Sequence, residues 1–457
     1  MTRRSCSGQA GGAGARRAAR PRALVLASLG ALVLGMPAAA RSPAGEAKTL
    51  TRFHDPVVVR TGLLAALPDH RTARYRVYAA RGGVLEAIPF QFDARDAGGE
   101  LVLSGEGAEG DFTFDDDDEL VFMAKDAGDR IGADRLPDAS DAVFEIEVED
   151  GARGGRGWVY VAHFPGEPPP RSPVRYAVFD TARGEARALY YEVRYSRDRS
   201  NFLAGVRVSP AAGGSGEELV RRMLMRINPT FSLLITTWAP TFTEESFSVT
   251  TEGVKNGPVR AVRRVRQALD LGPLFPEIPN GTVSTYYYFS SFVTPSTFSI
   301  PALALRSLRA FRFETLDDFG AAAADMRYWD AANPDGVPLG ARDGPAGAER
   351  DHEWWVVSGP AGTVLQTLRI PEAWRTWGIT RGTVFADAAA ANDAPDRGAG
   401  YRLLRMTNLQ PGAYRIDASL VVLPSPYRPG DEAQALAMLQ EPLAVRVRPV
   451  EIAAAAR

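Results

Sequence analysis

The chain is poor in the residues that carry most metal and thiol chemistry. Its one cysteine is Cys6. Its four histidines are His54, His70, His163 and His352, and no two of them have the spacing that would let one helix present both to a metal ion. Cys6 lies in a segment that we expect to be removed, which excludes disulfides, a zinc–thiolate site and a cysteine nucleophile from the mature chain. A histidine zinc site and a Ser-His-Asp hydrolase are also unsupported, since no Gly-x-Ser-x-Gly elbow joins a predicted strand to a helix.

Strong net charge and long apolar runs are absent as well. The net charge is −2, the isoelectric point is near 6.2, and charges of both signs are interspersed. Nucleic acid is therefore disfavoured as a partner, because binding to phosphates needs a basic stripe over a whole domain. No run after residue 40 approaches the length of a membrane helix, so we expect no integral membrane segment in the mature chain.

Residues 1–40 have the pattern of a signal peptide. Six arginines and no acid precede the apolar run at residues 23–34, and small residues follow it up to Ala40. A basic segment, a short apolar run and small residues at the cleavage site are typical of secretory signals. We expect cleavage after Ala40 and a mature protein exported to the periplasm or the extracellular space.

The rest of the chain is expected to be mostly β. Short apolar, aromatic and β-branched runs are separated by Gly, Asp and Pro, and 143–148 alternates apolar and acidic residues. Such patterns predict antiparallel strands with one polar face. We predict a small N-terminal antiparallel β domain at 41–164, a Pro-rich linker at 165–173, and a larger, supersandwich-like β-sandwich at 174–457, with a further division near 311–350 left open.

A few short helices are expected within this β body. Residues 217–226 follow a Gly-rich loop and contain helix-forming residues, and residues 315–326 open with Thr315 and two acids, which resembles an N-cap and a first helical turn. We therefore predict helices over these two segments.

The densest charge feature is the acidic run at residues 111–119. Alternate acids could place Asp115, Asp117 and Glu119 on one side, where their carboxylates suit Ca²⁺. The glycine and the distal glutamate of a calcium loop are missing, so a solvated turn that leads into a strand is the alternative reading. No other cofactor is expected.

Aromatic and cationic side chains gather at two places in the predicted sandwich. Flat aromatic faces stack on sugar rings, and arginines hold carboxylates in a bidentate manner. The alternative is that the aromatics are simply core. The candidate ligand-binding residues are Arg260, Arg264, Tyr286, Tyr288, Trp354 and Trp377.

Three short segments carry a resemblance. Residues 88–93 and 114–128 resemble segments of uncharacterised exported bacterial β-rich proteins, and residues 255–263 are similar to a strand of galactose-mutarotase-like supersandwich domains. The resemblance implies a sandwich and a connection with carbohydrates. It transfers no catalytic residue, because the His pair and Glu base of the mutarotases are not recognisable.

Three functions are compatible with these observations. The leading hypothesis is a secreted or periplasmic β-sandwich that binds a carbohydrate polymer or cell-envelope glycan. The second is an enzyme of the polysaccharide-lyase type, in which an arginine neutralises a uronate and a tyrosine moves the proton. The third is a structural or assembly module of the cell envelope. A groove lined by Arg260, Arg264 and exposed aromatics would favour the first two, and buried aromatics would favour the third.

Overall fold

The fold is seen in a computed structural model that describes residues 45–103, 110–198, 200–233, 236–270, 278–300, 302–319, 325–339, 345–386 and 398–451. The predicted signal peptide, residues 1–40, lies outside them. The described chain is mostly antiparallel β-sheet with few and short helices, which confirms the predicted fold class.

Two small sheets hold most of the N-terminal strands. The first contains β1 (Pro56–Arg60), β5 (Glu119–Met123) and β4 (Gln91–Asp93), in that order. The second runs β27 (Ala444–Val450), β6 (Ala142–Glu149), β7 (Arg156–His163), β2 (Tyr75–Arg81) and β3 (Val84–Ala87).

Two large sheets form the sandwich. The ten-stranded sheet runs β24 (Thr380–Ala386), β25 (Gly398–Leu404), β19 (Leu308–Phe319), β12 (Glu218–Leu233), β11 (Leu203–Val208), β10 (Tyr191–Tyr195), β9 (Glu185–Ala188) and β8 (Ala177–Asp180), with β13 (Thr236–Trp238) and β14 (Phe242–Thr243) paired to β12. The nine-stranded sheet runs β15 (Phe247–Asn256), β16 (Ala261–Leu269), β17 (Ile278–Tyr287), β18 (Ser291–Ile300), β26 (Gly412–Leu423), β23 (Gly362–Arg369), β22 (Trp354–Gly359), β20 (Arg327–Asp330) and β21 (Asn333–Pro338).

The helical elements are short. The α-helices are α1 (Ala302–Ser307), α2 (Glu372–Thr376) and α3 (Glu432–Gln440). The 3₁₀ turns are η1 (Thr61–Leu64), η2 (Thr72–Arg74), η3 (Ala124–Asp126), η4 (Ala133–Arg135), η5 (Pro210–Ala212) and η6 (Glu244–Ser246). Among the described residues, no helix has the length and apolar character needed to cross a bilayer.

The two large sheets share one hydrophobic core. Val220 and Phe319 of the ten-stranded sheet belong to the same buried cluster as Trp355 and Leu420 of the nine-stranded sheet. The rings of Phe319 and Trp355 lie 6.4 Å apart, edge to face. Burial of each large apolar side chain contributes about 1.5–3 kcal/mol, so the space between the sheets is where the sandwich gains its stability.

Both predicted helices are wrong. Residues 218–226 fall in β12 and residues 315–319 in β19, and these strands pair with each other, with Met225 opposite Thr315. Residues 320–324 of the second predicted helix lie outside the described residues. Met223, Met225 and Ile227 all face the interior of the sandwich, which is the period of two that a strand requires. Pairing between strands thus outweighs the helix propensity of the local sequence.

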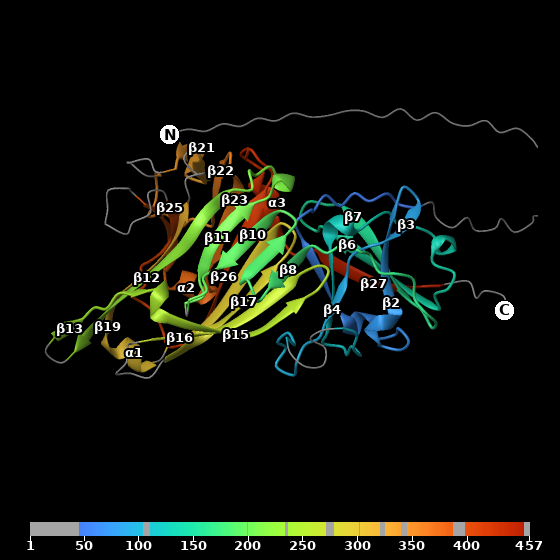
Figure 1. The fold of residues 1–457 in the computed structure, drawn as a ribbon, viewed down its shortest axis with the longest axis horizontal. Helices are drawn as coiled ribbons and strands as arrows, with labels where there is room; N and C mark the ends of the chain where they lie inside the picture. The colour runs from blue at the N-terminus through green and yellow to red at the C-terminus, as the bar shows by residue number, and fades with distance from the viewer. Residues whose placement is uncertain are drawn as a thin grey trace, which may run out of the picture. The chain divides into compact units, whose positions relative to one another are not determined.

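The last described strand returns to the N-terminal sheet. β27 pairs with β6 along its whole length, and Figure 1 shows this red strand among the blue and green strands of the N-terminal part. All described residues belong to one compact unit. The separation into bodies on either side of residues 165–173 stays a prediction.

Candidate functional site

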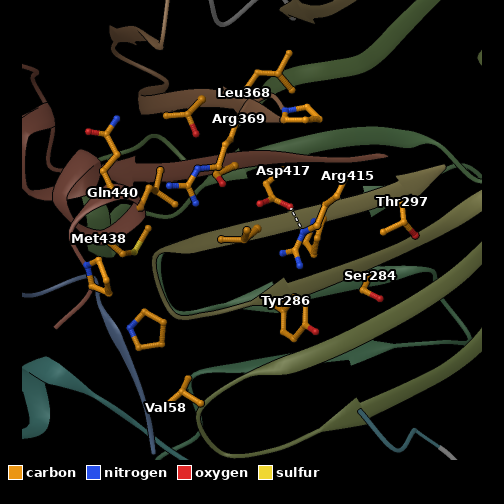
Figure 2. Close-up of a pocket in the computed structure, with 18 of the residues that line it drawn as sticks. Val58, Ser284, Tyr286, Thr297, Leu368, Arg369, Arg415, Asp417, Met438 and Gln440 are labelled. Atoms are coloured by element: carbon orange, nitrogen blue, oxygen red, sulfur yellow. Dashed lines mark hydrogen bonds and ion pairs between the residues drawn. The ribbon is translucent and has the colours of Figure 1, made fainter. Parts of the chain in front are cut away.

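An open groove of about 1760 Å³ lies on the outer face of the nine-stranded sheet. Side chains of β16, β17, β18, β26 and β23 form its floor, and residues of β1, α2 and α3 contribute to its rim. Figure 2 shows side chains from these separate segments projecting into one space. A cavity of this size is larger than most small-molecule pockets, which measure about 300–1,000 Å³.

The alternation of side chains along each strand determines which residues form the floor of the groove. On β17, Thr282, Ser284 and Tyr286 line the groove, whereas Val283 and Thr285 face the interior of the sandwich. Successive side chains of a strand point to opposite faces, so every second residue must tolerate water. The three residues of this strand on the groove face, Thr282, Ser284 and Tyr286, all carry a hydroxyl group.

Strand register sets these residues into rows. Thr282 lies opposite Arg266 on one neighbouring strand and opposite Thr297 on the other. Thr297 in turn lies opposite Arg415 on β26. One row of hydrogen-bonding side chains therefore crosses four adjacent strands.

A second row contains Arg264, Ser284, Asp417 and Arg369, and Arg415 of the first row is hydrogen-bonded to it. Arg264 donates from Nε to Ser284 Oγ at 3.3 Å and from Nη2 to Glu100 Oε2 at 2.8 Å. On β26, Arg415 Nε donates to Asp417 Oδ1 at 2.6 Å, and Asp417 lies opposite Arg369 of β23. Figure 2 shows Arg369 and Arg415 on either side of Asp417.

Arg369 is the cation in this groove that is available to a ligand. Its side chain is exposed, and within the described chain it forms no ion pair or side-chain hydrogen bond. The other arginines that line the groove each have a carboxylate partner: Arg95, Arg260, Arg264, Arg266, Arg375, Arg381 and Arg415. A planar guanidinium without a partner suits bidentate binding of a carboxylate.

Tyr286 supplies an aromatic surface beside these charges. It is half-buried in the groove, and the Arg260 guanidinium lies over its ring, 5.2 Å from the centroid. Burial raises the pKa of Tyr286, so its hydroxyl stays protonated at neutral pH. It therefore offers an aromatic ring and a hydrogen-bonding group but no phenolate base.

Arg260 itself is committed to a buried ion-pair cluster below the groove. Its Nη2 lies 2.7 Å from Asp93 Oδ2 and 2.8 Å from Glu119 Oε2, and its Nη1 donates to the Tyr288 hydroxyl at 3.3 Å. Lys255 Nζ lies 3.1 Å from the same Asp93 carboxylate. Burial opposes the ionisation of Asp93, but the charges of Arg260 and Lys255 outweigh it and lower the pKa of this carboxyl.

Backbone contacts close the cluster. Gln91 accepts hydrogen bonds from the backbone N–H groups of Val259 and Arg260, at 3.0 and 2.9 Å, and donates to both oxygens of Asp93. The three segments that carry the sequence resemblance, 88–93, 114–128 and 255–263, thus each contribute residues to this cluster. Its place in the fold is a junction between the three-stranded and nine-stranded sheets.

The predicted sugar-binding residues are therefore only partly brought together. Arg260, Arg264, Tyr286 and Tyr288 all line the groove, although Arg260 and Tyr288 are buried, at 3% and 6% exposure. Trp354 and Trp377 do not line it. Trp354 packs beside the cluster that contains Val356, and Trp377 packs on Tyr414 at 6.1 Å.

The three predicted calcium ligands are not assembled. Asp115 accepts a hydrogen bond from the backbone N–H of Asp117 at 3.0 Å, in an exposed turn. Glu119 is buried and binds Arg95 and Arg260, at 2.6 and 2.8 Å. Across the described ranges, no three His, Cys, Asp or Glu side chains are grouped so that they could hold a metal ion.

Sequence reasoning missed Arg369, Arg415 and Asp417. The alternation of Arg415 and Asp417 with Tyr414 and Ile416 is the signal that could have found two of them, because every second residue of a strand shares one face. Arg415 and Asp417 lie on β26 and Arg369 lies on β23. The pairing of β26 with β18 and β23 depends on strand order, which cannot be read from the sequence.

Comparisons with known proteins give little similarity. No protein-family model and no curated protein matches the sequence. Among solved structures, an α-mannosidase from Enterococcus faecalis V583 is 10% identical with a TM-score of 0.45, covering 87% of this chain and 45% of that chain. A protein of glycosyl hydrolase family 38 from Enterococcus faecalis is 10% identical with a TM-score of 0.46, covering 88% of this chain and 47% of that one. This chain thus spans less than half the length of either structure, and the resemblance to mutarotase-like domains stays a prediction.

Proposed function

We propose that the groove binds a carbohydrate chain that carries carboxylates, without catalysing a reaction. The observation that carries the proposal is the pair of polar rows on the nine-stranded sheet, with Arg369 as their unpaired cation. Hydroxyl-bearing side chains match the hydroxyl groups of sugars, and Arg369 matches a uronate carboxylate. The open length of the groove suits a polymer better than a small molecule.

Tyr286 supports the same proposal and argues against a lyase. An aromatic ring that is half-exposed beside hydrogen-bonding groups is suited to the apolar face of a sugar ring. A lyase needs a tyrosine that gives up its proton easily, whereas burial raises the pKa of Tyr286. We therefore favour carbohydrate binding over proton abstraction. We place this binding outside the cytoplasm, because residues 1–40 have the pattern of a signal peptide.

The test compares polysaccharides that differ in charge. The purified protein is titrated by calorimetry with polygalacturonate and with neutral dextran. We expect saturable binding of polygalacturonate only, weakened about tenfold in Arg369→Ala, because a charge-assisted hydrogen bond contributes about 1.5–3 kcal/mol. Arg312→Ala is the matched control, since Arg312 is exposed on β19 and does not line the groove.

Two outcomes would overturn the proposal. One is equal affinity of the wild type and Arg369→Ala for polygalacturonate, or no binding at all. The other is a steady rise in ultraviolet absorbance from unsaturated products, which would make the groove the active site of a lyase.

A further inference from the structure

A second cavity, separate from the groove, lies inside the sandwich. It measures about 450 Å³ and is walled mainly by apolar side chains of both large sheets. Ile227 and Phe313 lie on its ten-stranded side, and Phe292 and Leu420 lie on its nine-stranded side. Its volume falls within the range of about 300–1,000 Å³ that is typical of pockets for small ligands.

One cation faces this apolar space. Arg263, on β16, is 4% exposed, and its Nη2 has no hydrogen-bond partner. Its guanidinium lies over the rings of Tyr195 and Phe179, 4.4 and 5.4 Å from their centroids, and within the described chain it forms no ion pair. The aromatic faces offset part of the cost of burying the charge, but they leave hydrogen-bond donors of the guanidinium unused.

The acidic side chain in this cavity does not neutralise Arg263. Asp317 accepts a hydrogen bond from Gln366 and forms no ion pair with Arg263. A buried charge without a counter-ion is costly, and an anionic group of a ligand beside Arg263 would reduce that cost.

We propose that the cavity binds a small amphiphile with an apolar hydrocarbon chain and one carboxylate head group, the head held by Arg263. The apolar walls would bury the chain, and burial of each methylene group favours binding. The alternation along β16 separates this site from the groove, since Arg264, the next residue, projects from the opposite face of the sheet.

Palmitate and hexadecanol are the probes, because they share the chain and differ in the charge of the head group. Equilibrium dialysis of the whole protein is expected to show saturable binding of palmitate, about 10- to 100-fold weaker in Arg263→Gln. Hexadecanol binding is expected to be insensitive to this substitution. Ile227→Trp adds bulk to the cavity from the ten-stranded sheet, whereas Arg263 lies on the nine-stranded sheet, and it is expected to weaken the binding of both probes.

Arg264→Gln is the matched control, and palmitate binding is expected to be unchanged in it. The proposal is overturned if the wild type shows no saturable palmitate binding, or if Ile227→Trp leaves binding unchanged. Equal losses of palmitate and hexadecanol in a folded Arg263→Gln protein would also contradict it. Should Arg263→Gln fail to fold, the Ile227→Trp result decides alone.

Discussion

Arg260 Nη2 and Asp93 Oδ2 lie 2.7 Å apart in the interior, although 166 residues stand between them in the chain. Asp93 ends β4 of the three-stranded sheet, and Arg260 immediately precedes β16 of the nine-stranded sheet. The pair and its neighbours fasten these two sheets together.

Loss of the arginine should therefore be costly. We expect Arg260→Met to lower the free energy of unfolding by about 3–5 kcal/mol, because it leaves Asp93 and Glu119 as buried charges without this partner. Arg264→Met removes a pair whose glutamate is 66% exposed and should cost about 1 kcal/mol or less. Urea denaturation measures both, and equal losses would contradict the role of the junction.

Gly257 should tolerate no side chain at the same junction. A Cβ at this position would lie 2.0 Å from Gln91 Oε1, which accepts the two backbone hydrogen bonds described above. We expect Gly257→Ala to destabilise the protein by about 1–3 kcal/mol through this overlap. Gly151→Ala is the control, since nothing lies within 4 Å of its added Cβ. Equal melting temperatures for the two variants would refute the prediction.

Asp317 should make stability depend on pH. Burial raises the pKa of its carboxyl from 3.8 to about 7. Between pH 3.8 and about 7, Asp317 loses its proton in the unfolded chain but keeps it in the folded one. The contribution of Asp317 to folding stability is therefore largest below pH 4 and is lost as the pH rises to about 7. The loss amounts to about 4 kcal/mol at most. Asp317→Asn should be more stable than the wild type at pH 8, which denaturation at pH 5 and pH 8 will show.

His54 should act in the acid range. Burial lowers the pKa of its imidazole from 6.5 to about 4, and its Nδ1 lies 2.9 Å from Ser290 Oγ. As the pH falls, His54 is protonated in the unfolded chain before it is protonated in the folded chain. The stability that neutral His54 contributes, about 3 kcal/mol at most, is therefore lost between pH 6.5 and pH 4. His54→Asn should show a shallower acid decline in melting temperature. An identical decline would rule His54 out as its cause.

Calcium should have no strong effect. Because Glu119 binds two arginines and does not join Asp115 and Asp117, we expect millimolar Ca²⁺ and a chelator to give the same melting temperature. Asp117→Ala should behave as the wild type in both conditions. A rise of several degrees that the substitution abolishes would restore the calcium site.

The alternation of side chains made the strands predictable but left their neighbours open. Residues 143–148 lie in β6 as expected, because their alternation of apolar and acidic residues matches the two faces of a sheet. The segment 217–226 misled the prediction, since its methionines and arginines favour a helix until β19 is available for pairing. Arg264 and Tyr286 were found as candidates, whereas Arg369 could be recognised only once β23 was placed beside β26.

The pairing of β27 with β6 has a consequence for how the protein is made. Nearly the whole sandwich is synthesised between these two strands, so β6 emerges long before the strand that covers it. Until then its edge, with Phe144, Ile146 and Val148, is open to pairing with other chains. Glu145 and Glu147 alternate with these apolar residues and, besides Arg448 of β27, have Arg130 and Arg156 as ion-pair partners. Charged side chains thus interrupt the apolar run of β6, which opposes pairing of the open edge with another chain before β27 is made.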